Sequence, residues 1–275
     1  MFGCVIGDIV GSVYEFNNIK TKDFPLFSSA SRVTDDSVCV CAVAESISLC
    51  KSPATVLRRW GAKYMDITGF SKSFTAWLNQ KTDESAHSKG NGAVMKIAPV
   101  GFLFRQKEKA YAVADRITAL SHDHPESYRA VHAYIDALHG CFEKRPIKDI
   151  LSEIQACYGY DMQRTPDEIR PNYNKFYYTC PKTVPEAILC ALHADSFEDA
   201  IRNAVSLGGD SDTLACMTGG LAEARFGIPK EIKRKAWGLI PFDMRWCLSR
   251  LYVSQRFIEK NPKFLQFSFK QHFRE

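Results

Sequence analysis

The chain of 275 residues is long enough for one large domain with a substantial core, and it carries a net charge of +5. Its 45% hydrophobic and 24% charged residues exclude a disordered or fibrous protein. The ten cysteines form no C-x-x-C pair, which excludes zinc-ribbon and thioredoxin-like sites and favours reduced thiols in a cytoplasmic protein.

The N-terminal stretch MFGCVIGDIVGSVYEF has no basic region, and Asp8 interrupts its short apolar run. It therefore lacks the pattern of a signal peptide, and no window of the chain approaches 18 uninterrupted apolar residues. We expect a protein with no membrane partner.

Helical periodicity dominates the chain, and period-two strand patterns are missing apart from the short KFYYTC at 175–180. No linker or internal repeat divides the sequence. We therefore predict an all-α, compact single-domain bundle of ten or more helices over residues 1–275. The clearest helical patterns cover residues 126–142, 146–159, 196–209, 210–227, 229–240 and 245–260.

Local signals set several helix ends. Pro146 is expected at a first helical position, Gly159 as the stop of the same helix, and Ser196 as an N-cap. Long irregular stretches inside a helical domain tend to carry function. Here they are residues 16–34, 79–99 and 159–182.

Polar residues gather at the predicted start of the helix over 210–227. Asp210, Asp212 and Thr213 follow two glycines and precede an apolar run. Helix capping explains one of these acids, because the helix dipole and free N–H groups favour carboxylates there. An EF-hand is excluded, since the loop would need a glycine at its sixth position.

A similar cluster lies far upstream, where Thr34, Asp35 and Asp36 precede another apolar run. If the two clusters meet in the fold, they offer four carboxylates and two hydroxyls, which suit Mg²⁺, Mn²⁺ or Ca²⁺. Two bridged cations would relieve the repulsion between the acids. From the residues alone, this shared metal site and two independent capping clusters both remain open.

Two further segments carry polar chemistry. Gly90-Asn91-Gly92 is a turn whose backbone N–H groups are able to approach a phosphate, although such turns are common. His122 and His124 stand at a helix end before Pro125, where a structural role is the simpler interpretation for either residue alone.

These segments, in this order, resemble the ADP-ribosylglycohydrolase family, which includes dinitrogenase-reductase-activating glycohydrolase and the ADP-ribosyl-acceptor hydrolases. The resemblance covers nearly the whole chain. The matching stretches are GCVIGDIVGSVYE (3–15), TDDS (34–37), GNGAVMKIAPVG (90–101), SHDHPE (121–126), TVPEAI (183–188) and LGGDSDTLACMTGGLAEARFG (207–227).

The resemblance implies an all-α fold that holds two divalent cations, Mg²⁺ or alternatively Mn²⁺. Carried over by position, the metal ligands are Thr34, Asp35, Asp36, Asp210, Asp212 and Thr213. Asp35, Asp36 and Asp212 are also candidates for proton transfer, and Glu15 for acid–base assistance from a loop over the metals. The residues implied for substrate binding are Ser88, Gly90, Asn91, Gly92 and His122.

The implied reaction is hydrolysis at C1″ of the distal ribose, which releases ADP-ribose from an ADP-ribosylated protein, nucleic acid or small molecule. The acceptor does not follow from the sequence, and we expect a monomer. Lys96 replaces an arginine common among relatives, and Ser37 and Ser121 replace threonines. These departures leave every proposed metal ligand intact.

Two other functions are compatible with parts of the sequence. An HD-type phosphohydrolase would use His122 and Asp123, but it would leave the two carboxylate clusters without a role. A member that binds ADP-ribose without catalysis is the second alternative, against which the intact clusters argue. The basic segment 230–275, with eleven Lys or Arg and four acids, keeps a polyanionic partner open.

Overall fold

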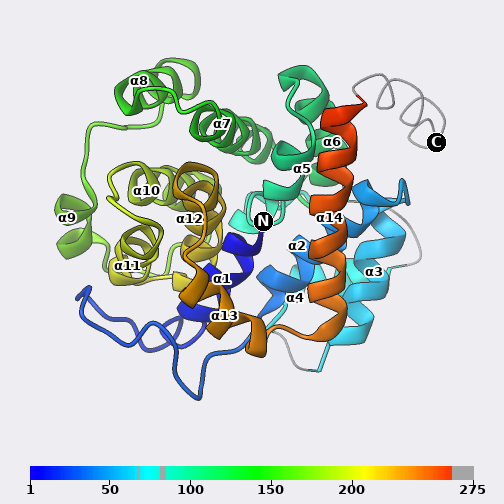
Figure 1. Ribbon diagram of the computed structural model, residues 1–275, viewed down its shortest axis with the longest axis horizontal. Helices are drawn as coiled ribbons and strands as arrows, with labels where there is room; N and C mark the ends of the chain where they lie inside the picture. The colour runs from blue at the N-terminus through cyan, green and yellow to red at the C-terminus, as the bar shows by residue number, and fades with distance from the viewer. Residues whose placement is uncertain (67–68, 81–84, 262–275) are drawn as a thin grey trace.

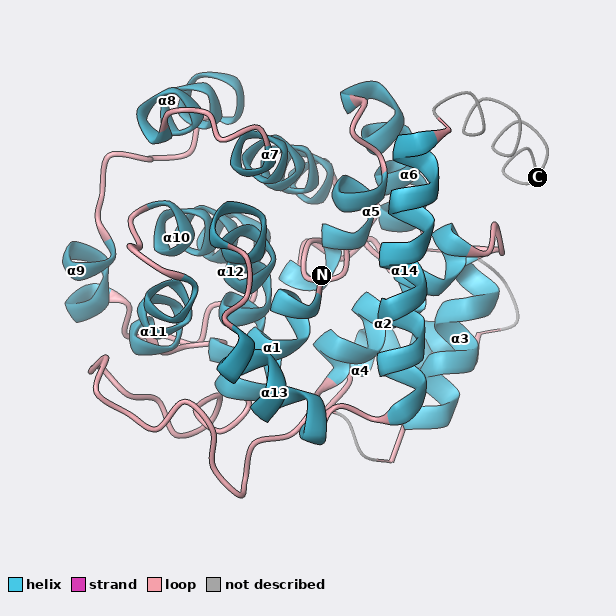
Figure 2. Cartoon of the chain, in the orientation of Figure 1, coloured by secondary structure: helices cyan, strands magenta, loops and turns pink. Residues whose placement is uncertain are grey.

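The computed structural model describes residues 1–66, 69–80 and 85–261 of the chain (Figure 1). All regular structure in these residues is helical (Figure 2), and an isolated bridge between Gly90 and Thr179 is the nearest approach to a strand. None of these helices is long and apolar enough to cross a membrane.

The α-helices fall into three consecutive stretches of the chain. The first holds α1 (Phe2–Gly11), α2 (Asp35–Ser48), α3 (Pro53–Tyr64) and α4 (Lys72–Asn79). The second holds α5 (Ala98–Leu103), α6 (Lys107–Ala119), α7 (Pro125–Phe142), α8 (Ile147–Tyr158) and α9 (Pro166–Ile169). The third holds α10 (Cys180–Leu192), α11 (Phe197–Leu207), α12 (Ser211–Phe226), α13 (Lys230–Leu239) and α14 (Phe242–Lys260).

Two short 3₁₀ helices, η1 (Asn91–Ala93) and η2 (Arg170–Asn172), complete the set. Figure 1 shows α7, α10 and α12 nearly end-on while α14 runs across the view, so helices cross steeply as in an orthogonal bundle. The prediction of an all-α, single-domain fold is confirmed. Its extension to residues 262–275 lies outside the described residues.

Most of the helix ends follow the local signals. Ser196 caps α11 by accepting a hydrogen bond from the N–H of Asp199, and α8 stops at Gly159, whose φ of 68° suits glycine. Pro146 differs from the prediction by one position. It is the N-cap of α8, because its extended ψ of 134° lies outside the helical range.

The two central helices, α1 and α12, are buried along most of their length. Gly3, Gly7 and Gly11 recur every four residues on α1 and face the α12 backbone. A Cβ atom on Gly7 would lie 1.9 Å from the carbonyl oxygen of Ala215, and one on Gly3 would lie 2.1 Å from that of Gly219. The backbones therefore touch, and residues between these glycines come close to the start of α12.

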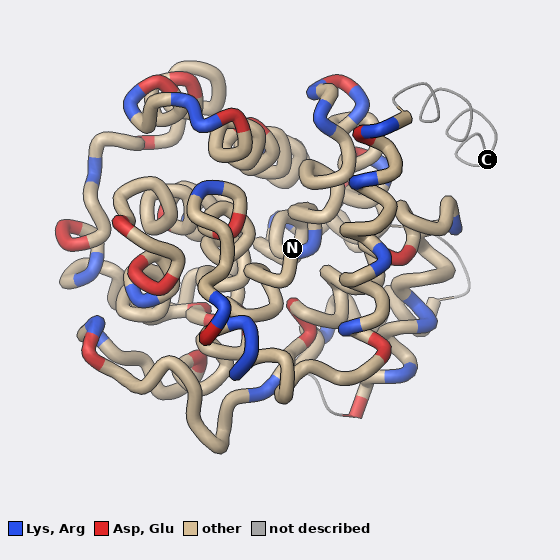
Figure 3. Tube along the Cα trace, in the orientation of Figure 1, with Lys and Arg blue, Asp and Glu red and all other residues tan. Residues whose placement is uncertain are grey.

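Charged residues lie mainly on the outside of the molecule (Figure 3). The described part of the predicted basic C-terminal segment forms α13 and α14, and its remainder at 262–275 lies outside the described residues. Lys233 and Arg234 on α13 and Arg250 and Arg256 on α14 are exposed. These basic side chains therefore lie on the solvent-facing sides of α13 and α14, whose apolar sides are buried.

We expect Gly7→Ala to lower the free energy of unfolding by about 3 kcal/mol, because the new methyl group meets backbone that cannot move aside. Urea denaturation measures the change. Gly238→Ala on α13 is the matched control, since a Cβ there has no neighbour within 4 Å and alanine favours a helix. A loss no larger than that of the control would contradict the close crossing of α1 and α12.

Candidate metal centre and substrate cavity

The first acidic cluster occupies the N-terminus of α2. Thr34 is the N-cap, and its Oγ1 accepts a hydrogen bond from the N–H of Asp36 at 3.3 Å. Asp35 and Asp36 lie in the first turn, where the helix dipole favours negative charge. Because Asp36 is only 2% exposed, this turn carries a carboxylate into the interior.

Asp8 on α1 holds this helix start from the opposite side. Its carboxylate accepts hydrogen bonds from the N–H and hydroxyl of Thr34 at 2.9 and 2.6 Å. It also accepts from the N–H of Ser37 at 3.1 Å and from the Ser37 hydroxyl. Burial raises the pKa of Asp8, and these hydrogen bonds oppose the shift. The buried acid therefore fixes residues 34–37 in space.

The second cluster occupies the N-terminus of α12. Gly208 and Gly209 have φ angles of 76° and 69°, in the left-handed region that favours glycine, and they turn the chain into the helix. Asp210 is the N-cap and accepts a hydrogen bond from Asn91 Nδ2 at 2.7 Å. Asp212 follows in the first turn and is 2% exposed.

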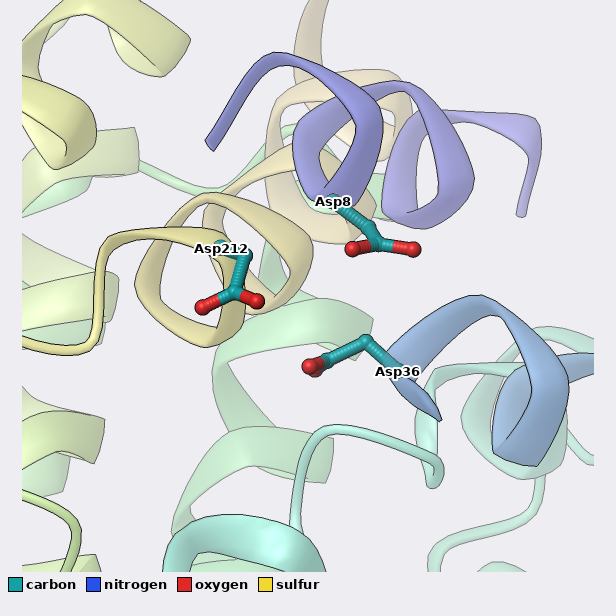
Figure 4. Close-up of side chains that lie close together, drawn as sticks. All are labelled: Asp8, Asp36 and Asp212. Atoms are coloured by element: carbon teal, nitrogen blue, oxygen red, sulfur yellow. The ribbon is translucent and has the colours of Figure 1, made fainter. Parts of the chain in front are cut away.

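The two helix starts meet directly, since Thr213 Oγ1 donates a hydrogen bond to Asp36 Oδ2 at 3.0 Å. Figure 4 shows carboxylates from α1, α2 and α12 pointing toward a common space. Two sets of three side chains each have ligand oxygens within 4.8 Å of one another: Asp8, Asp36 and Asp212, and Glu15, Asp210 and Asp212. Thr34 caps α2, but Asp210 makes no capping hydrogen bond at α12, so capping does not account for the clustered acids.

This donor set fits a divalent cation. Asp36 Oδ1 is buried, and no group among the described residues donates a hydrogen bond to it. A buried carboxylate oxygen without a partner is costly, and a cation would satisfy it. The surrounding oxygens come from carboxylates and hydroxyls, which are the ligands that Mg²⁺, Mn²⁺ and Ca²⁺ prefer.

Crowding changes the protonation of these acids. Burial, together with the charge of Asp8, raises the pKa of Asp35 to about 8. Burial also raises the pKa of Asp212 well above its usual value, and the charge of Asp210 adds to this. The pKa of Glu15 rises to about 7 through burial and the charge of Asp210, against a hydrogen bond with Asp212. Burial and mutual repulsion thus both disfavour the charged carboxylates, and a bound cation would relieve both.

The acids form part of the wall of a cavity of about 400 Å³. Its other lining residues include all five of the predicted substrate-binding residues, namely Ser88, Gly90, Asn91, Gly92 and His122. Tyr178 O accepts a hydrogen bond from the N–H of Asn91 at 2.8 Å, and Cys180 Sγ donates to Gly90 O at 3.1 Å. Tyr178, just before α10, and Cys180, its first residue, therefore hold the glycine turn in place.

His122 faces the same turn. A Cβ on Gly92 would lie 3.0 Å from His122 Nε2, so the histidine packs directly against the glycine. Its other ring nitrogen, Nδ1, lies 2.7 Å from Ser121 Oγ. Burial and then the charge of Lys96 hold the pKa of His122 well below its usual range, which favours a neutral ring.

Several cavity residues were not expected from the sequence. Lys96 is 1% exposed and donates a hydrogen bond to Gly92 O, so it supports the turn and supplies a buried positive charge. The aromatic side chains of Phe16, Phe176 and Tyr178 line the cavity while remaining largely exposed. The sequence offered one signal that Asp8 belongs to the site, because it is an acid inside an otherwise apolar helical stretch.

The family model described as ADP-ribosylglycohydrolase matches residues 1–247, which contain both acidic clusters and the glycine turn. The chain belongs to this family.

Two curated relatives and one solved structure illustrate the family likeness. The chain is 26% identical over 278 residues to the ADP-ribosylarginine hydrolase Tri1 of Serratia proteamaculans (strain 568), covering 84% of this chain and 72% of the relative. It is 23% identical over 277 residues to the protein of that name from Pseudomonas putida (strain GB-1), covering 86% and 73%. A solved structure named ADP-ribosylglycohydrolase-related protein complex superposes with a TM-score of 0.71 at 20% identity, covering 92% of this chain and 95% of that chain.

Membership in the ADP-ribosylglycohydrolase family identifies ADP-ribosyl hydrolysis as the general class of reaction. The six predicted metal ligands are brought to two adjoining helix starts. The role of all six as ligands remains a prediction, and Thr34 is in addition engaged by Asp8 and by the N–H of Asp36.

Mn²⁺ at a hundredfold excess over its Kd should stabilise the wild-type protein by about 2.7 kcal/mol and raise its Tm. For Asp212→Asn we expect a much smaller rise, while the metal-free Tm stays equal or increases because a neutral amide replaces an acid whose charged form is disfavoured by burial and by Asp210. Calorimetry with Mn²⁺ and with EDTA measures both. Asp167→Asn, on a side chain that is 80% exposed, should respond as wild type. A full Mn²⁺ response in Asp212→Asn would contradict the metal centre.

Proposed function

We propose that this protein hydrolyses the bond between C1″ of the distal ribose and an acceptor, and so releases ADP-ribose with the help of two divalent cations. The observation that carries the proposal is the meeting of two acidic helix starts beside a glycine turn in one cavity. One cluster alone would need no more than capping. Two clusters in contact need a cation, and the cavity leaves room for a ligand beside it.

The ligands that we assign to the cations are Thr34, Asp35, Asp36, Asp210, Asp212 and Thr213. Mg²⁺ is our first choice and Mn²⁺ the second, because all of these groups offer hard oxygen atoms. When bound, such cations orient sugar hydroxyls and lower the pKa of water. Asp8 holds the α2 side of this centre, and Asn91 holds Asp210.

The protein's own residues supply binding and proton transfer. Gly90 and Gly92 line the cavity, and we assign their turn to the diphosphate; the missing side chain of Gly92 lets His122 pack against this turn. Asn91, between them, joins this turn to Asp210 through its side-chain amide. The sugar at the end of the diphosphate would then reach the carboxylates, and we assign to Asp35, Asp36 or Asp212 the acceptance of a proton from attacking water.

Glu15 is the group that we assign to acid–base assistance. It belongs to the second carboxylate set yet comes from a loop, so it reaches the cavity from a different direction than the helix acids. We assign arginine as the first acceptor to test, because both named relatives are ADP-ribosylarginine hydrolases. The positive charge of a guanidinium group would also be attracted by these carboxylates.

The proposal is tested by release of ADP-ribose from arginine, serine, DNA and RNA acceptors, each with Mg²⁺ and with EDTA. We expect release from at least the arginine conjugate, and we expect EDTA to abolish it. Calorimetry with ADP-ribose runs in parallel. Tight ADP-ribose binding without release from any acceptor would contradict the hydrolase and indicate a protein that binds ADP-ribose without catalysis.

Glu15→Ala should keep Mn²⁺ binding and lower kcat by about 10²–10⁴-fold, which is the usual contribution of general acid–base catalysis. Titration calorimetry and steady-state assays on the arginine conjugate measure the two effects. Glu198→Ala is a control on an exposed helix acid that pairs with Arg202. Full activity in Glu15→Ala would remove Glu15 from the mechanism.

A further inference from the structure

The loop between α1 and α2, residues 12–34, carries Glu15 and has no regular structure, as Figure 2 shows. A loop cannot aim a carboxylate by itself, because it lacks the repeating hydrogen bonds of a helix. Glu15 nevertheless has a carboxylate oxygen within 4.8 Å of those of Asp210 and Asp212. Contacts outside the loop must therefore set its position.

The side-chain amide of Asn18 links the backbone of Glu15 to a residue outside the loop. Its Nδ2 donates to the backbone carbonyls of Tyr14 at 2.7 Å and of Glu15 at 3.0 Å. The same nitrogen lies 3.0 Å from Gly209 O, so its two hydrogens are shared among three carbonyls, and Oδ1 accepts from the Gly209 N–H at 2.7 Å. One side chain thus holds the backbone of Glu15 and both backbone groups of Gly209.

Gly209 directly precedes Asp210, so this amide reaches the turn that aims the second acidic cluster. The preceding Gly208 is shaped for the contact, since a Cβ there would lie 3.2 Å from Asn18 Oδ1 at a φ of 76°. Gly208 therefore allows the amide to approach the turn closely. Asn18 connects the loop acid with the helix acids through backbone atoms alone.

Other contacts fasten the loop farther from Glu15. Lys20 Nζ donates to the carbonyls of Tyr173, at 2.7 Å, and Leu207. Phe16 stacks on Phe176 with ring centroids 6.2 Å apart, but Phe16 is 76% exposed. Neither contact touches the backbone of both Glu15 and Gly209.

We propose that Asn18 is a positioning residue, which holds Glu15 over the acidic clusters by joining its loop to the turn at 208–210. The consequence for turnover rests on the proposed function of Glu15. The joint, by which we mean the hydrogen bonds of Asn18 to Glu15 and Gly209, does not depend on that function, because it lies within the protein.

Asn18→Ala should lower kcat on the arginine conjugate by about tenfold or more while KM changes less than about twofold. Misplacing a reacting group by 1 Å is able to cost about 10²-fold. Mn²⁺ affinity should stay within about twofold of wild type, since Asn18 contacts no proposed metal ligand and Asp210 is also held by Asn91 and by its place at the start of α12. Asn17→Ala is the matched control, because Asn17 is exposed and no hydrogen bond of its side chain is found in the described parts of the chain.

A double-mutant comparison separates positioning from general damage. In a Glu15→Ala background, adding Asn18→Ala should lower kcat no further, because the residue acts through Glu15. If the two losses multiply instead, Asn18 does not act by placing Glu15, and the proposal is overturned.

Hydrogen exchange tests the joint without any turnover. In Asn18→Ala the Gly209 amide should exchange at least about tenfold faster than in wild type, and in Asn17→Ala it should not change. Unchanged exchange at Gly209 in Asn18→Ala would overturn the proposal. If wild type releases ADP-ribose from no acceptor, the proposed function fails, and this exchange measurement still decides whether the joint exists.

Discussion

Where α1 crosses α12, the two backbones touch, because Gly3, Gly7 and Gly11 present no side chain to the facing helix. This contact brings Asp8, between two of the glycines, toward the start of α12 and into reach of the start of α2. A larger residue at any of the three positions would push the helices apart. The spacing of the acids then follows from backbone packing in the core, which is the least adjustable part of a folded protein.

The helix starts have two opposing effects on the acids. The helix dipole and the donors around Asp8 and Asp210 favour the charged carboxylates. Burial and mutual repulsion disfavour them, as the raised pKa values of Asp35, Asp36 and Asp212 indicate. The fold thus keeps the acids in place without fully compensating their charge. A site whose acids are ordered, but whose negative charge is only partly compensated, is well suited to a cation, since little rearrangement precedes binding.

Much of this arrangement could be predicted from local patterns. Apolar residues at helical spacing gave the helices over 126–142 and 196–209, and polar residues before apolar runs gave both acidic clusters. The pairing of α1 with α12 could not be read in the same way, because a helix buried on all sides has no polar face to mark its orientation. Asp8 and Asn18 were missed for a related reason, since their partners lie elsewhere in the chain and one sequence does not reveal such pairs.

Two neutral amides converge on the turn before α12, and their chemistry fits its surroundings. Asn91 binds the carboxylate of Asp210 from the glycine turn, and Asn18 binds the backbone of Gly209 from the Glu15 loop. A lysine or arginine in either place would hold the turn more strongly. It would also neutralise the acids and compete with a cation for their oxygens. Amides fix the geometry and leave the negative charge in place, so the loops of the cavity are joined to the acidic centre without weakening it.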